Sequence, residues 1–351
     1  MGFPNTRWTS LVFVSLAIME IFLLRTVPAL SEPVSTESQP TRFRTWLRSP
    51  LALDNQFPLA LFHETSEPLA ASLLGKGQTR GDLKLVISNT YASNGKHFKN
   101  DTEAASVEMG VDYGLLESFE VGAGIAVINE DGGTFDHLID QWHRFFGMPR
   151  GGRNKSPEDE IRLSAIRDDG RIIRIDDGEF GLSNLRLKSK VALMTQDADS
   201  SLNFSLAGYI TAPTATSRRF GTPAPDLGLQ LLAGHDGESY SLHSGVGATL
   251  FTDTETKGYE FSAVQFSGFI GGGYQLLPQS LPDLAIVATV TAYSDLIENI
   301  PTFPDHSLYL DAGLRYLLSE KIAVNGFIRE NPSPRKGTTD ITVILGLTAF
   351  L

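Results

Sequence analysis

The chain has 351 residues, no cysteine and a formal net charge of −12 at pH 7. The lack of cysteine excludes a disulfide framework and a thiolate metal site, and the acidic balance argues against a nucleic-acid partner, whose phosphates would repel it. A mean hydropathy of −0.06 is too polar for a helical membrane protein. It suits a barrel, in which only alternate strand residues meet lipid.

The N-terminus has the pattern of a secretory signal peptide, which we place at residues 1–31. Arg7 gives a weakly basic start, Leu11–Leu24 is apolar, and Ala29-Leu30-Ser31 offers a small-x-small cleavage site. The rival interpretation is an uncleaved anchor. About fourteen apolar residues interrupted by Glu20 are, however, too few to span a bilayer as a helix, and no later stretch reaches the roughly twenty residues needed.

Residues 32–80 differ in composition from the rest of the chain and are predicted to form an N-terminal extension. Residues 32–40 are rich in Ser, Thr, Pro and Glu, so we expect them to be disordered after processing. The stretch that follows has apolar clusters around Trp46 and in Asn55-Gln56-Phe57-Pro58-Leu59, but no clean period. Two alternatives stay open: a small plug in a barrel lumen, or an irregular segment along the periplasmic rim.

The remaining residues, 81–351, alternate apolar and polar side chains in segments of about ten residues, as transmembrane strands do. The predicted strands are 83–90, 103–113, 118–128, 183–195, 201–212, 226–234, 239–251, 261–275, 283–294, 307–317, 321–330 and 340–351. The last strand shows the pattern best, since Val343, Leu345 and Leu347 share one face. The simplest partner for so many apolar rows is lipid. The sequence therefore predicts an all-β, transmembrane, antiparallel up-and-down β-barrel of about 12 strands.

The connections between these strands support the same topology. With the N-terminus in the periplasm, the turns on one side are short and the loops on the other side are mostly longer, which is the asymmetry of outer-membrane barrels. A soluble β-sandwich or propeller would have to cover all the outward apolar rows. We therefore expect a location in the outer membrane of a Gram-negative bacterium, with lipid and lipopolysaccharide as surroundings.

The longest outer loop, 129–182, contains a helical period over residues 134–147. The large apolar residues recur at three- and four-residue spacing: Phe135, Leu138, Ile139, Trp142, Phe145 and Phe146. This amphipathic helix fits a constriction or gate in the barrel mouth, a helix lying at the outer leaflet, or a simple cap. Further along the loop, 161–166 and 171–175 predict an extramembrane hairpin.

The inward rows carry mixed charge, which fits either a water-filled pore or a closed, ion-paired interior. They contain Lys84, Glu108, Asp112, Glu120, Arg186, Lys188, Lys190, Asp311, Arg315, Asn325 and Arg329. The candidate binding residues are Trp142 and His143 in the loop helix and Arg186, Lys188, Arg315 and Arg329 in the lumen. Small inward residues such as Gly245 and Gly273 could leave local space.

The sequence gives little support for a catalytic site or a metal site. In the adjacent pairs His243-Ser244 and His306-Ser307, the two side chains point to opposite faces of a strand and cannot share a proton within it. A metal set of His137, Asp140 and His143 lacks a fourth ligand. No catalytic residue, metal site or cofactor is predicted.

Three motifs resemble a known family. They are Gly132-Gly133-x-Phe135-Asp136-x-x-Ile139-x-x-Trp142-His143-x-x-Phe146-Gly147 with Gly152-Arg153 and Pro157, Asn55-Gln56-x-Pro58-Leu59, and Phe180-Gly181-Leu182-Ser183-Asn184-Leu185. Together they are similar to the proteobacterial family called domain of unknown function 3187, over residues 50–351. The resemblance implies an outer-membrane-type β-barrel of unassigned function without catalytic residues to transfer. Where the family pattern has Asp after Gly-Leu-Gly, this chain has Ser183-Asn184.

The function that these patterns favour is a narrow channel or binding protein for a small solute, gated or capped by residues 129–182. The alternatives are a surface enzyme that modifies lipid, and a structural or adhesion barrel without transport.

Overall fold

A computed structural model describes residues 44–94, 97–132, 141, 161–196, 201–276, 283–301, 303, 306–332 and 337–351. The predicted signal peptide lies outside these residues. So does the predicted helix 134–147, of which only Gln141 is described, in a helical conformation.

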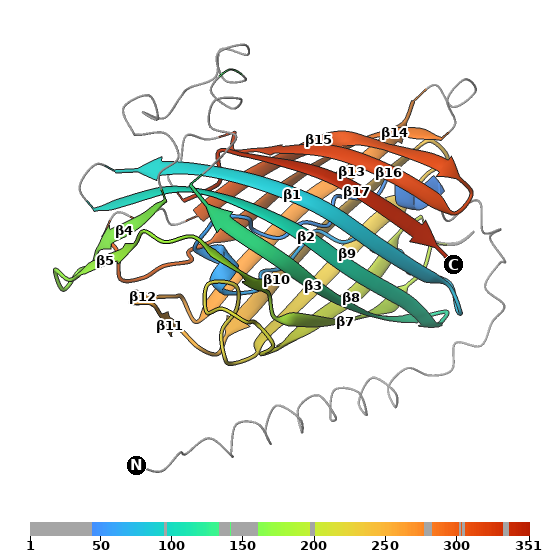
Figure 1. Cartoon of the computed structure of the whole chain (residues 1–351). Helices are drawn as coiled ribbons and strands as arrows, with labels where there is room; N and C mark the ends of the chain where they lie inside the picture. The colour runs from blue at the N-terminus through green and yellow to red at the C-terminus, as the bar shows by residue number, and fades with distance from the viewer. Residues whose placement is uncertain are drawn as a thin grey trace, which may run out of the picture. The chain divides into compact units, whose positions relative to one another are not determined.

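In this part of the chain, twelve long antiparallel strands close into a cylinder (Figure 1). They are β1 (Thr79–Ser93), β2 (Phe98–Leu116), β3 (Phe119–Asp131), β7 (Leu185–Met194), β8 (Asn203–Ala212), β9 (Asp226–Asp236), β10 (Tyr240–Phe251), β13 (Val264–Gln275), β14 (Leu284–Ser294), β15 (His306–Ser319), β16 (Ile322–Glu330) and β17 (Ile341–Phe350). Each pairs with its neighbour in sequence order, and β17 closes on β1. The predicted barrel is confirmed; β1 and β2 are longer than predicted because they remain paired as far as Ser93 and Lys99.

The strands turn apolar side chains outward and polar or small ones inward. In β17, Leu345 and Leu347 are exposed, whereas Thr342, Ile344 and Thr348 are buried. Exposed apolar residues recur around the cylinder: Leu83, Leu85, Met109, Val111, Leu229, Leu231, Leu242, Ile270, Leu314 and Leu345. A water-facing surface rarely carries so much contiguous apolar area. Because the sheet is closed and these rows lie on its outside, a β-sandwich is excluded and lipid is the partner that fits.

Shorter elements lie at the end of the barrel with the longer loops. The predicted hairpin is present as β4 (Arg162–Ile166) and β5 (Ile172–Ile175), and β4 extends the sheet from β2. A second hairpin pairs β11 (Glu255–Thr256) with β12 (Tyr259–Glu260). β6 (Glu179–Leu182) runs into β7 along the same edge of β3. No helix of the described residues is both long and apolar enough to cross a membrane.

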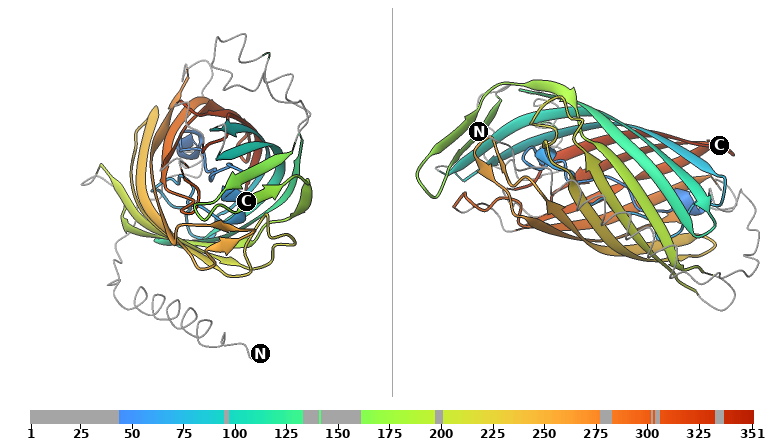
Figure 2. Two further views of the ribbon diagram at one scale, coloured as in Figure 1. Left: turned by 90° about the vertical axis from the view of Figure 1, so that its left-hand side faces the viewer. Right: turned by 90° about the horizontal axis from the view of Figure 1, so that it is seen from below.

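Residues 44–78, which we call the luminal segment, run inside the barrel (Figure 2). An ascending arm, 44–56, packs Leu51 and Leu53 against inward residues of β1, β14, β16 and β17. The chain turns at 57–63, which includes the 3₁₀ turn η1 (Ala60–Phe62). A descending arm, 64–78, returns past β7–β10, where Ala71 packs with Leu232 and Phe269.

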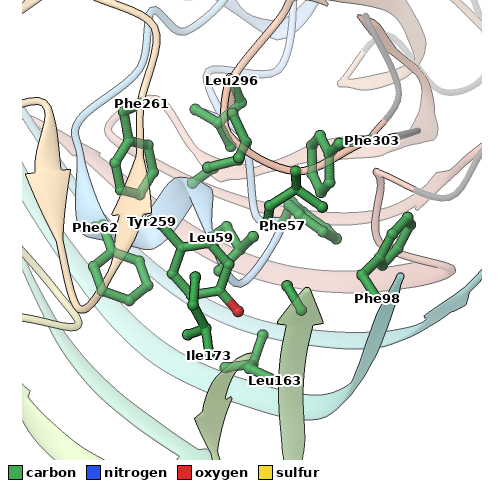
Figure 3. Close-up of a cluster of buried hydrophobic side chains, with 14 of the residues drawn as sticks. Phe57, Leu59, Phe62, Phe98, Leu163, Ile173, Tyr259, Phe261, Leu296 and Phe303 are labelled. Carbon is green, nitrogen blue, oxygen red and sulfur yellow. The ribbon is translucent and has the colours of Figure 1, made fainter. Parts of the chain in front are cut away.

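The turn of the luminal segment belongs to a buried apolar cluster at the long-loop end, which we call the mouth cluster (Figure 3). It joins the turn to both outer hairpins and to the loop between β14 and β15. Its main members are Phe57, Leu59, Phe62, Leu163, Ile173, Tyr259, Phe261, Leu296, Ile300 and Phe303. The hairpin of the predicted outer loop 129–182 therefore lies over the turn of the luminal segment.

The lipid-facing assignment can be tested with Leu345→Arg, at an exposed position in the middle of β17. We expect a loss of about 2–4 kcal/mol in the free energy of unfolding, because an arginine near the bilayer centre must leave water. The control Leu351→Arg, at the end of the chain, should lose about 0–1 kcal/mol. Equilibrium unfolding in lipid vesicles measures both, and equal losses would contradict the assignment.

Candidate functional site

Lumen cations bind the backbone of the ascending arm. The bonds run from Arg315 Nη1 to Ser49 O (2.6 Å), from Arg315 Nη2 to Pro50 O (3.0 Å), from Lys84 Nζ to Ala52 O (2.7 Å) and from Arg329 Nη2 to Leu53 O (3.1 Å). An irregular segment has no ladder of its own to satisfy these carbonyl oxygens. The inward positions of the strands provide the donors in place of a neighbouring strand.

The descending arm is bound in the same manner by strands β7–β9 and β14. The donors and acceptors are Lys190 Nζ to Ala70 O (3.1 Å) and Ser72 O (2.8 Å), Gln230 Nε2 to Glu67 O (3.0 Å), Tyr209 Oη to Glu64 O (3.0 Å) and Tyr293 Oη to Ser66 O (2.9 Å). In both arms, therefore, barrel side chains donate to many of the backbone carbonyl oxygens.

Arg186, on β7, connects the two arms. Its Nη2 lies 3.2 Å from Asp54 Oδ2 of the ascending arm and also bonds the Glu64 carboxylate of the descending arm. Its Nη1 lies 3.6 Å from Glu67 Oε1. The side chain is 9% exposed, so these contacts form away from bulk water, where removing one partner costs far more than at a surface.

The carboxyl groups around Arg186 titrate differently. Burial raises the pKa of Glu64 to about 7, although the nearby guanidinium of Arg186 opposes the shift. Burial likewise raises the pKa of Asp54 to about 6. Burial also acts on Glu67, but Lys188 and Arg186 outweigh it and hold the pKa of that carboxyl below its usual range. Of these three carboxyl groups, Glu64 thus has the pKa closest to neutral pH.

A cavity of about 180 Å³ remains between the luminal segment and strands β1–β3, β7–β9 and β15–β17. Toward the periplasmic end its lining is charged, and most of the charges are paired. The pairs are Lys84–Glu108 (3.0 Å), Lys188–Asp112 (3.0 Å), Arg80–Asp112 (2.5 Å) and Lys190–Glu120 (3.0 Å). Toward the mouth the lining is small or apolar, with Ala104, Ser106, Ala126 and Ile128.

The lumen histidine has structural partners. His243 is buried, its Nε2 lies 3.2 Å from Asp236 Oδ1, and its Nδ1 accepts from the Ala71 N–H at 3.3 Å. Ser244 turns to the other face, as predicted from the alternation. Among the described residues no cluster of three or more metal-ligating side chains occurs. His137, Asp140 and His143 lie outside those residues.

The four predicted lumen residues all face inward, and each contacts the luminal segment. Lys188 does so through Glu67, at 3.8 Å. Trp142 and His143 lie outside the described residues. Sequence reasoning missed Asp54, Glu64 and Glu67 as the acids that meet these cations, because the extension shows no period that would orient them.

The expectation that small lumen residues leave space is wrong for the glycines it named. A Cβ at Gly245 would lie 2.5 Å from the Phe269 ring, and a Cβ at Gly273 would lie 2.8 Å from Arg48 Cα. The neighbouring side chains and the luminal segment occupy the space that these glycines provide. Gly273 in particular lets the backbone of the ascending arm approach β13 closely.

A closed cylinder with lipid-facing apolar rows around a charged, partly filled lumen defines an outer-membrane β-barrel. The chain belongs to the family described as Protein of unknown function (DUF3187), whose model matches residues 26–350. This confirms the resemblance seen in the sequence motifs.

Solved structures with a similar fold are outer-membrane proteins. The COG4313 outer membrane channel from Pseudomonas putida F1 matches with a TM-score of 0.56 and 13% identity, over 82% of this chain and 100% of that chain. The NanC porin gives a TM-score of 0.44 and 8% identity, over 77% and 98%. None of the curated proteins matches the sequence.

Arg186→Gln should release the luminal segment from the barrel. It leaves buried carboxylates without their cation, which costs about 3–5 kcal/mol. We expect trypsin to cleave after Arg48, which is 3% exposed in the folded protein, much faster in the variant, as followed by mass spectrometry in detergent micelles. The control Arg174→Gln removes an exposed ion pair with Asp176. Equal cleavage rates in the two variants would show that Arg186 does not hold the luminal segment in the barrel.

The docking of the luminal segment should weaken as the pH rises through about 7. Because burial favours the protonated form of Glu64, its contribution is fully present below the ordinary glutamate pKa and is lost as the pH passes the raised value. Between pH 6 and 8 we expect a loss of about 1 kcal/mol in the free energy of opening. Hydrogen exchange of residues 57–67, corrected for the intrinsic rate, measures this loss.

Glu64→Gln is the matched control for that pH dependence, since the amide keeps the shape of the side chain and does not titrate. The variant should lose most of the pH dependence between pH 6 and 8, and the part that remains near pH 6 belongs to Asp54, whose pKa burial raises to about 6. A variant with the same slope as the natural protein would show that another group titrates.

Proposed function

We propose that the protein is a narrow outer-membrane channel or binding protein for a small solute, constricted by its own luminal segment and capped by part of the 129–182 loop. The observation that carries this proposal is the cavity beside the luminal segment, which is lined by charged residues of five strands. A barrel with a purely structural role has no need for a cavity among buried ion pairs, which are costly to place.

The cap is supported by the way the outer loops interlock. Arg167, in the hairpin turn of the 129–182 loop, donates from Nη1 to Gly258 O at 2.8 Å. The Asp168 N–H donates to Asn299 O at 3.0 Å. These bonds hold three loops together over the mouth cluster. Passage from outside therefore requires this cap to move, or the solute to enter between the loops.

The solute contacts we propose are those lumen cations that line the cavity, Arg186, Lys188 and Arg315. Arg329 is fully buried by Asp311 and the ascending arm, so we give it a positioning role. The similar fold of a protein described as an outer membrane channel is consistent with transport. For Trp142 and His143, a constricting role in the mouth stays a prediction.

Conductance in planar bilayers tests the channel. Replacing residues 46–74 with a Gly/Ser linker of equal length should raise the single-channel conductance several-fold, because the lumen loses the side chains that fill it. Deleting residues 134–147 should also raise conductance if the loop helix constricts the mouth. The control Arg174→Gln should leave conductance unchanged. An absence of current in both the natural protein and the linker variant would overturn the channel.

A further inference from the structure

Two arginines on neighbouring strands bind the ascending arm alike but differ at one edge of the guanidinium group. Both Arg315 and Arg329 donate to its carbonyl oxygens. Arg329 also binds both oxygens of Asp311, with Nε 2.6 Å from Oδ1 and Nη2 3.0 Å from Oδ2. This is the bidentate geometry that a guanidinium group offers to a carboxylate.

Arg315 has no such carboxylate. Among the described residues no Asp or Glu oxygen lies within ion-pair distance of it, and its buried Nε has no acceptor. Its Nη1 and Nη2 are bound by Trp46, Ser49 and Pro50, and the Trp46 ring centroid lies 4.6 Å from Cζ. The edge that Asp311 occupies on Arg329 is therefore left without a partner on Arg315.

A second unsatisfied atom lies on the neighbouring strand β16. Asn325 is the direct cross-strand partner of Arg315, and its buried Oδ1 also has no hydrogen-bond partner among the described residues. Its amide lies flat over Gly346, where a Cβ would come within 2.5 Å of it. Both side chains line the cavity. Other buried polar atoms of the described residues also lack a protein partner, Arg186 Nε among them. These two belong to one cross-strand pair that lines the cavity, which points to a ligand there.

We propose that Arg315 and Asn325 form a recognition site for the carboxylate of a small organic acid that enters the cavity; this rests on the proposed function and names its solute class. The carboxylate takes the Nε–Nη2 edge of Arg315, as Asp311 does on Arg329. The Asn325 amide, whose oxygen and nitrogen exchange places by rotation, donates to the same carboxylate. The partly exposed Trp46 indole moves aside to admit it.

Within the cavity, Arg315 is the cation at which an incoming anion meets the least competition. Its other lysine and arginine residues each have a carboxylate within ion-pair distance; they are Arg80, Lys84, Arg186, Lys188 and Lys190. An incoming acid would have to compete with those carboxylates. At Arg315 its direct competitors are neutral carbonyl and hydroxyl groups, and the Asp82 carboxylate acts on Arg315 only from beyond ion-pair distance.

The test uses the full chain in detergent micelles, with sodium propionate and its neutral isostere propionamide as probes in saturation-transfer NMR titrations. We expect propionate to bind at least about tenfold more tightly than propionamide. Arg315→Lys should weaken propionate about tenfold, because lysine keeps the charge but lacks the bidentate edge. Asn325→Asp should abolish propionate binding by placing a protein carboxylate beside Arg315.

The control Arg48→Lys makes the same change at a buried arginine of the luminal segment outside the cavity. It should leave propionate affinity unchanged. Equal affinities for the two probes, retained binding in Asn325→Asp, or an equal loss in Arg48→Lys would each overturn the site. If the natural protein conducts in bilayers without binding propionate, the site fails and the channel stands. If it binds propionate as described and never conducts, the channel fails and the binding site stands.

Discussion

The backbone of the luminal segment is the constraint on which the interior of the barrel depends. Thirty-odd residues with almost no regular structure pass through a closed sheet, where peptide groups without hydrogen bonds are costly. The barrel cannot offer strand edges, since all of its edges are paired. Long side chains are the remaining donors. This requirement explains why lysine and arginine recur on the inward faces of the strands.

The lysine and arginine residues that bind the backbone of the luminal segment must also be neutralised, and acids of that segment do part of this. Arg186 neutralises acids from both arms, so it closes the luminal segment on itself as well as on β7. Apolar contacts fix the arm positions at three depths: Leu47 near the periplasmic end, Leu51 and Leu53 in the middle, and the mouth cluster beyond. The cavity is left along β2 and β3, whose inward residues Gly110 and Gly124 carry no side chains to fill it.

The wall of the barrel could be predicted from the sequence because alternation is a local property. Leu345 and Thr342 face opposite sides whatever the rest of the chain does, and Arg186 and Arg315 were assigned to the lumen on the same basis. The partners of Arg186 could not be predicted, since they lie more than a hundred residues away in a segment without period. The break between β6 and β7 at Ser183-Asn184 could not be predicted either. There Asn184 Oδ1 accepts from the Ala215 N–H (2.9 Å) and Asn184 Nδ2 donates to Thr222 O (3.1 Å).

In the proposed channel, selectivity for solutes resides in the luminal segment and its side-chain contacts and not in the twelve strands. The twelve strands satisfy one another and face lipid outside, so their geometry changes little when a solute enters. The luminal segment is held by individual side-chain bonds, each of which can be exchanged for a bond to a solute or to water. On the proposal made above, an acid that supplies the missing partner of Arg315 displaces only the Trp46 ring from the guanidinium group and breaks no ion pair. A cation would instead have to displace Lys84 or Lys188 from their carboxylates, so the proposed site favours acids.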